Sequence, residues 1–266
     1  MQTHSNKTVI RDRKHPQLWQ SYLWWDELVQ LRKRHVLRVS AIERGDCNMD
    51  AQFDRDMMEH AGLDALVNYA CKTMTNYGES MGPVWGWITS IRGLASGSLA
   101  AQLLAQIDDI SRFDTVSKLW RFAGYAVING AAEKNHRGEK SHYNARLKSV
   151  CYLVADQFIK QRTPIYREMY DEEKERQHRL HPVVMCRECE MPREQCQSKK
   201  AHHQLYNDAH LHNRAWRKTI KVFLQHLWLV WREAEGLPVS EPYVEAVMGH
   251  THIVRPERVE MDIAAD

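Results

Sequence analysis

The sequence lacks the features that define several large protein classes. It contains no uninterrupted apolar run of about eighteen residues, which is the length that a membrane-spanning helix needs. Its first residues, MQTHSNKTVIRDRKH, are polar and basic and include no apolar segment of the secretory-signal type. No Walker motif, dinucleotide-binding glycine fingerprint or catalytic carboxylate pair is recognisable. We therefore expect a cytoplasmic protein that does not associate with membranes.

The alternation of apolar and polar residues that marks a half-buried strand is almost absent as well. Apolar residues recur at helical spacing instead, and 43% of the residues are hydrophobic, which suits a soluble protein with a core. The pattern predicts an all-α fold, with a coiled-coil-like helical hairpin followed by a globular helical bundle. The expected segments are a flexible basic arm (1–14), the hairpin arm (15–80), the bundle core (81–180), a Cys/His insertion (181–208), and a C-terminal helix with a tail (209–266).

The hairpin arm is predicted from a heptad pattern between Pro16 and Arg44, a stretch with no internal glycine or proline. One heptad position holds Leu18, Trp25 and Val39, and another holds Tyr22, Val29 and Val36. Helices over 49–60 and 63–77, interrupted at Gly62, would form the returning limb.

The bundle is predicted to contain helices over 84–91, 98–107, 115–122, 141–160, 164–178 and 209–235, with a further short helix near Val244. The helix over 209–235 carries Ile220, Phe223, Leu227, Val230 and Trp231 at helical spacing, which favours a stripe that faces the core or a dimer partner.

A glycine-bracketed turn joins the helices over 84–91 and 98–107. A helix-hairpin-helix turn can direct backbone N–H groups and a helix N-terminus at a nucleic-acid phosphate. The candidate phosphate-contact residues are Gly93, Gly97 and Ser98. An ordinary turn between packed helices is the alternative interpretation.

Charge is distributed unevenly, although the formal net charge is only +3. Between Lys118 and Lys148 there are seven basic residues and two acidic ones. Local segregation of this kind is typical of a surface that binds a polyanion.

Three segments of this region, GSLAAQLLAQIDDISRF, KLWRFAGYA and RGEKSHYNARLKS, resemble the C-terminal domain of bridge-RNA-guided insertion-sequence transposases. There a similar hairpin is followed by Ile-Ser-Arg-Phe, an Ala-Gly turn and a basic loop that opens a helix. The stretch GAAEKNHRGEKSHYNARLKS is also similar to the Nop domain of box C/D guide-RNA proteins. The Tas proteins of tandem interspaced guide RNA systems carry a related Nop-like module. The motifs cover residues 85–160, and the hairpin arm matches the Nop coiled coil by architecture.

The resemblance implies a homodimeric guide-RNA-binding protein that targets complementary DNA. It also implies a bacterial or phage-encoded protein of a mobile element, associated with the nucleoid during targeting. The chain looks most like the Tas proteins that carry no nuclease, because the loop 124–138 has no serine where the transposases place their nucleophile. Nothing before the hairpin reads as a RuvC-like strand with its catalytic acids. We therefore expect no catalytic residue and no enzyme activity, and any nuclease would be a separate partner.

The resemblance places the guide RNA on the basic loop and on the helix that follows it. There, cations would face phosphates, and polar groups would reach 2′-hydroxyls and bases. The candidate RNA-binding residues are Arg121, Lys134, Asn135, Arg137, Lys140, Ser141, His142, Asn144, Arg146 and Lys148. A second basic surface is predicted at Arg214, Arg217, Lys218 and Lys221. The alternative interpretation is a basic helix face that is merely solvated. Tyr143, Leu147, Val150 and Val154 are expected to point to the core.

The six cysteines are too few for a disulfide scaffold, and Cys47, Cys71 and Cys151 are isolated. The candidate zinc ligands are Cys186, Cys189, Cys196, His202 and His203. A Cys-x2-Cys knuckle, the third cysteine and one histidine would complete a structural zinc site that orders the insertion. The alternatives are a flexible loop with exposed thiols or part of an HNH nuclease, whose ββα unit the sequence does not indicate.

Two further functions stay open at this stage. One is a transposase-type recombinase or nuclease that cuts DNA, and the other is a DNA-binding module that uses no guide.

Overall fold

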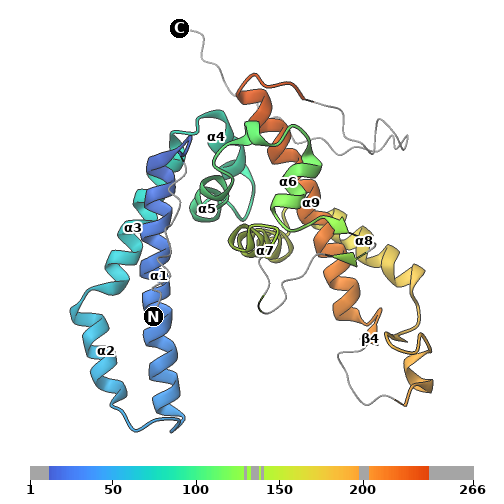
Figure 1. Cartoon of the computed structure of the whole chain (residues 1–266), viewed down its shortest axis with the longest axis horizontal. Helices are drawn as coiled ribbons and strands as arrows, with labels where there is room; N and C mark the ends of the chain where they lie inside the picture. Colours follow the sequence, from blue (N-terminus) through green and yellow to red (C-terminus); the bar gives the residue numbers. More distant parts are fainter. Residues whose placement is uncertain (1–11, 129–130, 133–137, 139–140, 198–203, 240–266) are drawn as a thin grey trace, which may run out of the picture. The chain divides into compact units, whose positions relative to one another are not determined.

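The computed structural model describes residues 12–128, 131–132, 138, 141–197 and 204–239. Within these ranges the chain is built predominantly from helices, which confirms the predicted all-α class (Figure 1). None of the described helices is both long and apolar enough to cross a bilayer. The helix expected near Val244 lies outside the described residues.

Residue contacts define two compact units. The first comprises the chain up to Met81 together with Ala100–Asp109, and the second comprises Gly82–Leu99 and the chain from Ile110 onward. Residues 100–109, which lie within the segment expected to form the bundle core (81–180), group by their contacts with the unit that contains the arm.

The arm consists of α1 (Pro16–Glu43), α2 (Ala51–His60) and α3 (Leu63–Glu79). The long helix α1 packs against both α2 and α3, which gives the predicted helical hairpin with a broken second limb. The break is at Gly62, whose φ of 60° lies in the left-handed region that glycine tolerates. The buried carboxylate of Asp54 joins the two limbs, because it accepts a hydrogen bond from Arg38 and pairs with His35.

The heptad prediction for α1 names six residues, of which four are buried, Trp25 is partly buried and Val36 is exposed. Leu18, Tyr22, Val29 and Val39 are buried, but Val36 is 50% exposed. Val36 lines an open groove together with Gly62, at the break between α2 and α3.

The Asp-Asp pair that follows α5 (Ser98–Ile107) holds the beginning of α1. Asp108 accepts a hydrogen bond from the backbone N–H of His15 at 3.2 Å and lies 3.7 Å from the guanidinium of Arg13. A carboxylate here also faces the positive end of the α1 dipole. These contacts explain why residues 100–109 group with the arm.

In the second unit, α9 (Asp208–Ala234) is the central element. It contacts α4 (Pro83–Ser90), η1 (Ile110–Arg112), α6 (Val116–Phe122), α7 (Ala145–Lys160) and α8 (Tyr166–Leu180). The ring of Phe223 lies 6.1 Å from that of Trp87, 5.1 Å from that of Phe158 and 5.7 Å from that of Tyr166. One aromatic cluster therefore joins α4, α7, α8 and α9.

The carbonyl of Phe113 fixes the Ile-Ser-Arg-Phe segment to α9. It accepts hydrogen bonds from the indole of Trp228 at 2.6 Å and from the guanidinium of Arg232 at 3.2 Å. Both donor side chains are buried. The motif quoted for the family resemblance thus has a structural role at this point.

Several local expectations need correction. The helix predicted from residue 141 begins at Ala145, because the side chain of Asn144 caps it by accepting the N–H of Leu147. The helix predicted over 115–122 begins at Val116, with Thr115 at the N-cap position and Asp114 paired with Lys118. Two small antiparallel pairs, which the sequence analysis assigned to loops, join β1 (Val127–Ile128) to β2 (Ala131–Ala132) and β3 (Met185–Cys186) to β4 (Gln204–Leu205).

Candidate nucleic-acid interface and metal site

The two ends of the basic loop are held together at Gly124. This residue has a φ of 77°, and a Cβ added to it would lie 2.6 Å from Cδ2 of the Tyr143 ring. The N–H of Asn144 donates to the carbonyl of Phe122 at 2.8 Å, and the hydroxyl of Tyr125 donates to the carbonyl of Lys148 at 3.3 Å. We call these contacts between 122–125 and 143–148 the loop stem.

The structure brings six of the predicted RNA-binding residues to the stem or next to it. Arg121, His142 and Arg146 are exposed, while Ser141, Asn144 and Lys148 are half-buried. The ammonium of Lys148 lies 4.3 Å from the centre of the Tyr143 ring, a cation–π arrangement. Lys134, Asn135, Arg137 and Lys140 lie outside the described residues.

Two of these six residues, Ser141 and Asn144, form hydrogen bonds that fix the local backbone. The hydroxyl of Ser141 accepts the N–H of Tyr143 at 3.3 Å and donates to its carbonyl at 3.0 Å, and the amide of Asn144 caps α7. The expected core residues Tyr143, Leu147, Val150 and Val154 are buried, as predicted. The start of α7 is therefore fixed on its inner side and presents His142 and Arg146 outward.

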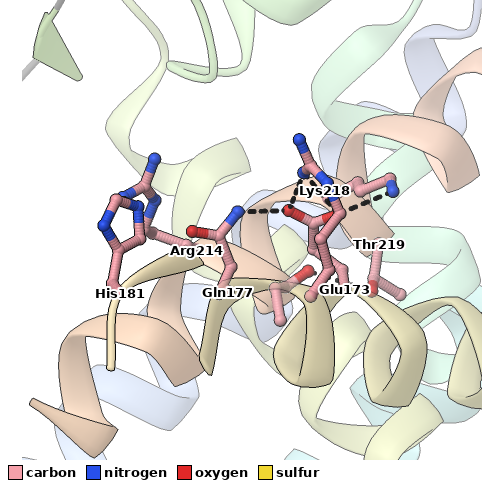
Figure 2. Close-up of polar contacts among 8 residues, drawn as sticks. Glu173, Gln177, His181, Arg214, Lys218 and Thr219 are labelled. Atoms are coloured by element: carbon pink, nitrogen blue, oxygen red, sulfur yellow. Dashed lines mark hydrogen bonds and ion pairs between the residues drawn. The ribbon is translucent and has the colours of Figure 1, made fainter. Parts of the chain in front are cut away.

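The predicted second basic surface on α9 consists of two kinds of cation. Lys218 lies 2.8 Å from a carboxylate oxygen of the buried Glu173, and Figure 2 shows this pair beside Gln177. Burial alone would raise the pKa of Glu173, but hydrogen bonds from Lys218 and Gln177 outweigh it and lower that pKa. The exposed Arg214 donates to the imidazole of His181 at 3.1 Å (Figure 2).

Arg217 and Lys221 are held differently, on aromatic rings. The guanidinium of Arg217 lies 5.8 Å from the ring centre of Tyr125 and donates to the Tyr125 carbonyl at 3.4 Å. The ammonium of Lys221 lies 4.0 Å from the ring centre of Trp120, whose indole N–H donates to the Lys221 carbonyl. The sequence predicts these cations but not the rings beneath them, because the rings come from α6 and the loop stem, which are distant from α9 along the chain.

The glycines of the 93–97 hairpin have packing roles. A Cβ on Gly93, whose φ is 93°, would lie 3.2 Å from Cβ of Gln157 in α7. The N–H of Gly97 donates to the carbonyl of Leu94 and so closes the turn. Phosphate contact by Gly93, Gly97 and Ser98 stays a prediction.

The three clustered cysteines converge between β3 and η2 (Arg193–Gln195). The Sγ atoms of Cys186, Cys189 and Cys196 all lie within 4.8 Å of one another. A hydrogen bond from the backbone N–H of Cys189, together with one from the Cys196 thiol, lowers the pKa of Cys186 to about 7. Thiolate character at this spacing suits a soft metal such as zinc. His202 and His203 lie outside the described residues.

The fold and the site together define a helical protein with a basic loop closed on an aromatic stem. In comparisons with known proteins, residues 87–171 match the model of the family described as Transposase IS116/IS110/IS902 family. The matched stretch begins in α4 and ends in α8, so it includes the hairpin, α6, the loop stem and α7, and it links this region to that transposase family. No curated protein and no solved structure matches the chain.

The stem gives a direct test of the geometry. Replacing Gly124 with alanine would force a side chain into the left-handed region and against the Tyr143 ring, which should lower the free energy of unfolding by more than about 2 kcal/mol. Chemical unfolding followed by tryptophan fluorescence measures the loss. The matched control is Gly86→Ala, because Gly86 lies inside α4 with nothing within 4 Å of its added Cβ. That change should be neutral or stabilising by up to about 1 kcal/mol. Equal effects of the two changes would contradict the stem.

Proposed function

We propose that the protein binds a guide RNA through the basic loop and its stem, and that the RNA directs it to complementary DNA. The observation that carries this proposal is the loop stem, which pins together the two ends of a lysine- and arginine-rich loop within the region that matches a transposase family. In such a complex, base pairing reads the DNA sequence and the protein contacts the backbone of the heteroduplex.

The stem contributes to binding by limiting the freedom of the loop. A loop whose ends are fixed loses less conformational entropy when its side chains are ordered on a ligand. The exposed Arg146 and His142 border the point where the loop returns to α7. They add a cation for phosphates and a polar group for ribose hydroxyls or bases.

A recombinase or nuclease is the second candidate function, because the matched family is a family of transposases. We favour the non-catalytic alternative, in which any nuclease acts as a separate partner. Its support is that the stretch 124–138, where the resemblance places a nucleophile, contains no serine. Metal-dependent cleavage or strand joining of DNA by the RNA-bound protein would favour the enzyme instead.

We further propose that the protein is a homodimer, and that the arm rather than α9 forms the interface. The stripe on α9 is used within the chain: Ile220, Phe223, Leu227 and Trp231 are all buried. The arm, by contrast, exposes the large apolar residues Val36, Leu37, Met49, Phe53 and Met57. The same surface includes a groove of about 1070 Å³ that can receive side chains of a second arm. The apolar residues of its lining are Val36, Leu37, Met58 and Leu63.

We also propose a structural zinc ion on Cys186, Cys189 and Cys196, with His202 or His203 as the fourth ligand. The described part of the insertion has only two-residue strands and a single 3-10 turn, so it gains order from a metal crosslink. Bound zinc would supply cohesion between β3, β4 and η2, and no chemistry on the RNA.

Guide binding predicts that the purified protein carries RNA of defined length. Reversing the charges of Lys134, Arg137 and Lys140 should abolish RNA co-purification, because phosphate contacts dominate nucleic-acid affinity. The ratio of nucleic-acid to protein absorbance gives the amount of co-purified RNA, and sequencing of the extracted nucleic acid gives its identity and length. A control that reverses the exposed Arg34, Lys72 and Lys160 should retain the RNA. The guide-RNA proposal would be refuted if wild-type protein freed of RNA bound duplex DNA as tightly as the protein that carries RNA.

Dimerisation through the arm predicts that replacing Leu37 and Phe53 with lysine yields a monomer. Both side chains are more than 60% exposed, so these changes put charge into the interface without altering the packing within one chain. Light scattering after gel filtration gives the mass. The control is Leu180→Lys, an exposed apolar residue of α8. If the double variant is still a dimer, the proposal that the arm forms the interface is wrong.

The zinc proposal predicts about one zinc ion per chain in elemental analysis of the purified protein. Cys189→Ser should remove it by deleting a ligand, whereas Cys47→Ser, at an exposed cysteine of the arm, should leave it in place. The Sγ atoms of Cys189 and Cys196 are 3.5 Å apart. Metal-free protein with a disulfide between them would contradict the proposal.

A further inference from the structure

Arg217 and Lys221 lie one helical turn apart on α9, and each is paired with an aromatic ring. Among the residues that the structure describes, no carboxylate forms an ion pair with either of them. Their neighbour Lys218 differs sharply, since it neutralises the buried Glu173. The same helix therefore carries one cation with a built-in counter-charge and two cations whose described partners are rings and a backbone carbonyl.

The surroundings of the two cations are unfavourable for charge. Both side chains are half-buried. Burial lowers the pKa of Lys221, and repulsion from Arg217 lowers it further; burial also lowers the pKa of Arg217. A purely structural role at these positions would be served as well by an uncharged side chain of similar length, because the rings and the carbonyl supply no full counter-charge for the hydration that a half-buried cation loses.

The geometry restricts where an outside counter-ion would sit. Arg217 is hydrogen-bonded to the carbonyl of Tyr125, which is the first residue of the loop beyond Gly124. Lys221 lies over Trp120, one residue before Arg121. Stacking on the rings holds both side chains in place, which reduces the entropy lost when they bind an anion.

We propose that Arg217 and Lys221 bind a backbone phosphate of the RNA strand that the basic loop holds. This inference rests on the proposed function and adds to it a phosphate subsite on α9, next to the loop stem. An RNA phosphodiester is favoured over a protein carboxylate because the rings that hold the two cations, Trp120 and Tyr125, belong to a stretch of the sequence rich in basic residues, from Lys118 to Lys148. Arginine and lysine both suit phosphate, the former as a planar fork and the latter as a point charge.

The proposal predicts opposite behaviour for two neighbouring lysines. Lys221→Met keeps a long side chain on the Trp120 ring but removes the charge. It should leave the melting temperature unchanged or raised, while it weakens RNA binding. Lys218→Met removes the partner of Glu173, so it should lower the melting temperature and leave RNA binding unchanged.

The measurement is the affinity for the co-purified RNA, and for a single-stranded DNA of the same sequence, over a range of salt concentrations. Each lost phosphate contact reduces the slope of log K against log salt by about 0.7 for a single strand. Because the two cations share one phosphate, the double variant Arg217→Met/Lys221→Met should reduce the slope for RNA by about that amount, and Lys221→Met alone by part of it. Lys218→Met serves as the matched charge control.

The outcomes separate the two proposals. An unchanged slope in the double variant, with RNA still bound by the wild-type protein, would overturn the subsite and leave the guide-binding function standing. Absence of RNA binding by the wild-type protein would overturn both. A slope that falls for the DNA strand but not for RNA would also overturn the inference, by assigning the pair to the target strand.

Discussion

Burial of one face of α9 is the constraint on which the second unit depends. Phe223 lies at the junction of rings from α4, α7 and α8, so a single helix joins three others through aromatic contact. Two polar side chains of the same helix are also used at this core, where Trp228 and Arg232 donate to the carbonyl of Phe113. Because that face is committed to the interior, the remaining face of α9 is available only as a polar surface next to the loop stem.

The same constraint orders the functional proposals. A helix fixed on one side by its core holds Arg217 and Lys221 against Tyr125 and Trp120, so its cations are positioned before any ligand arrives. The same burial uses the apolar stripe of α9 within the chain, and this is why we propose the exposed apolar residues of the arm as the dimer interface. The proposed sites for RNA, for dimerisation and for zinc therefore lie on different elements of the chain.

Local patterns predicted the helices well, because apolar spacing and caps are encoded within each segment. Gly62 was recognised as a break, and the limits of α5 follow from Ser98 and Ile107. Features that depend on contacts between distant segments were not predictable. Val36 fits the heptad but lines an open groove, and α7 begins after its cap Asn144 rather than at Ser141. Nothing in the spacing of α9 separates Lys218 from Lys221, because the distinction comes from Glu173 on α8 and Trp120 on α6.

Ultraviolet crosslinking of the native RNA–protein complex, followed by mass spectrometry of the crosslinked peptides, tests the central claim most directly. The account predicts RNA adducts on peptides within 121–148, on both sides of the stem, and further adducts at the N-terminal half of α9 around Arg217 and Lys221. Adducts confined to the arm or to the cysteine-containing insertion would contradict it, because the RNA would then be held by a surface that the loop stem does not organise.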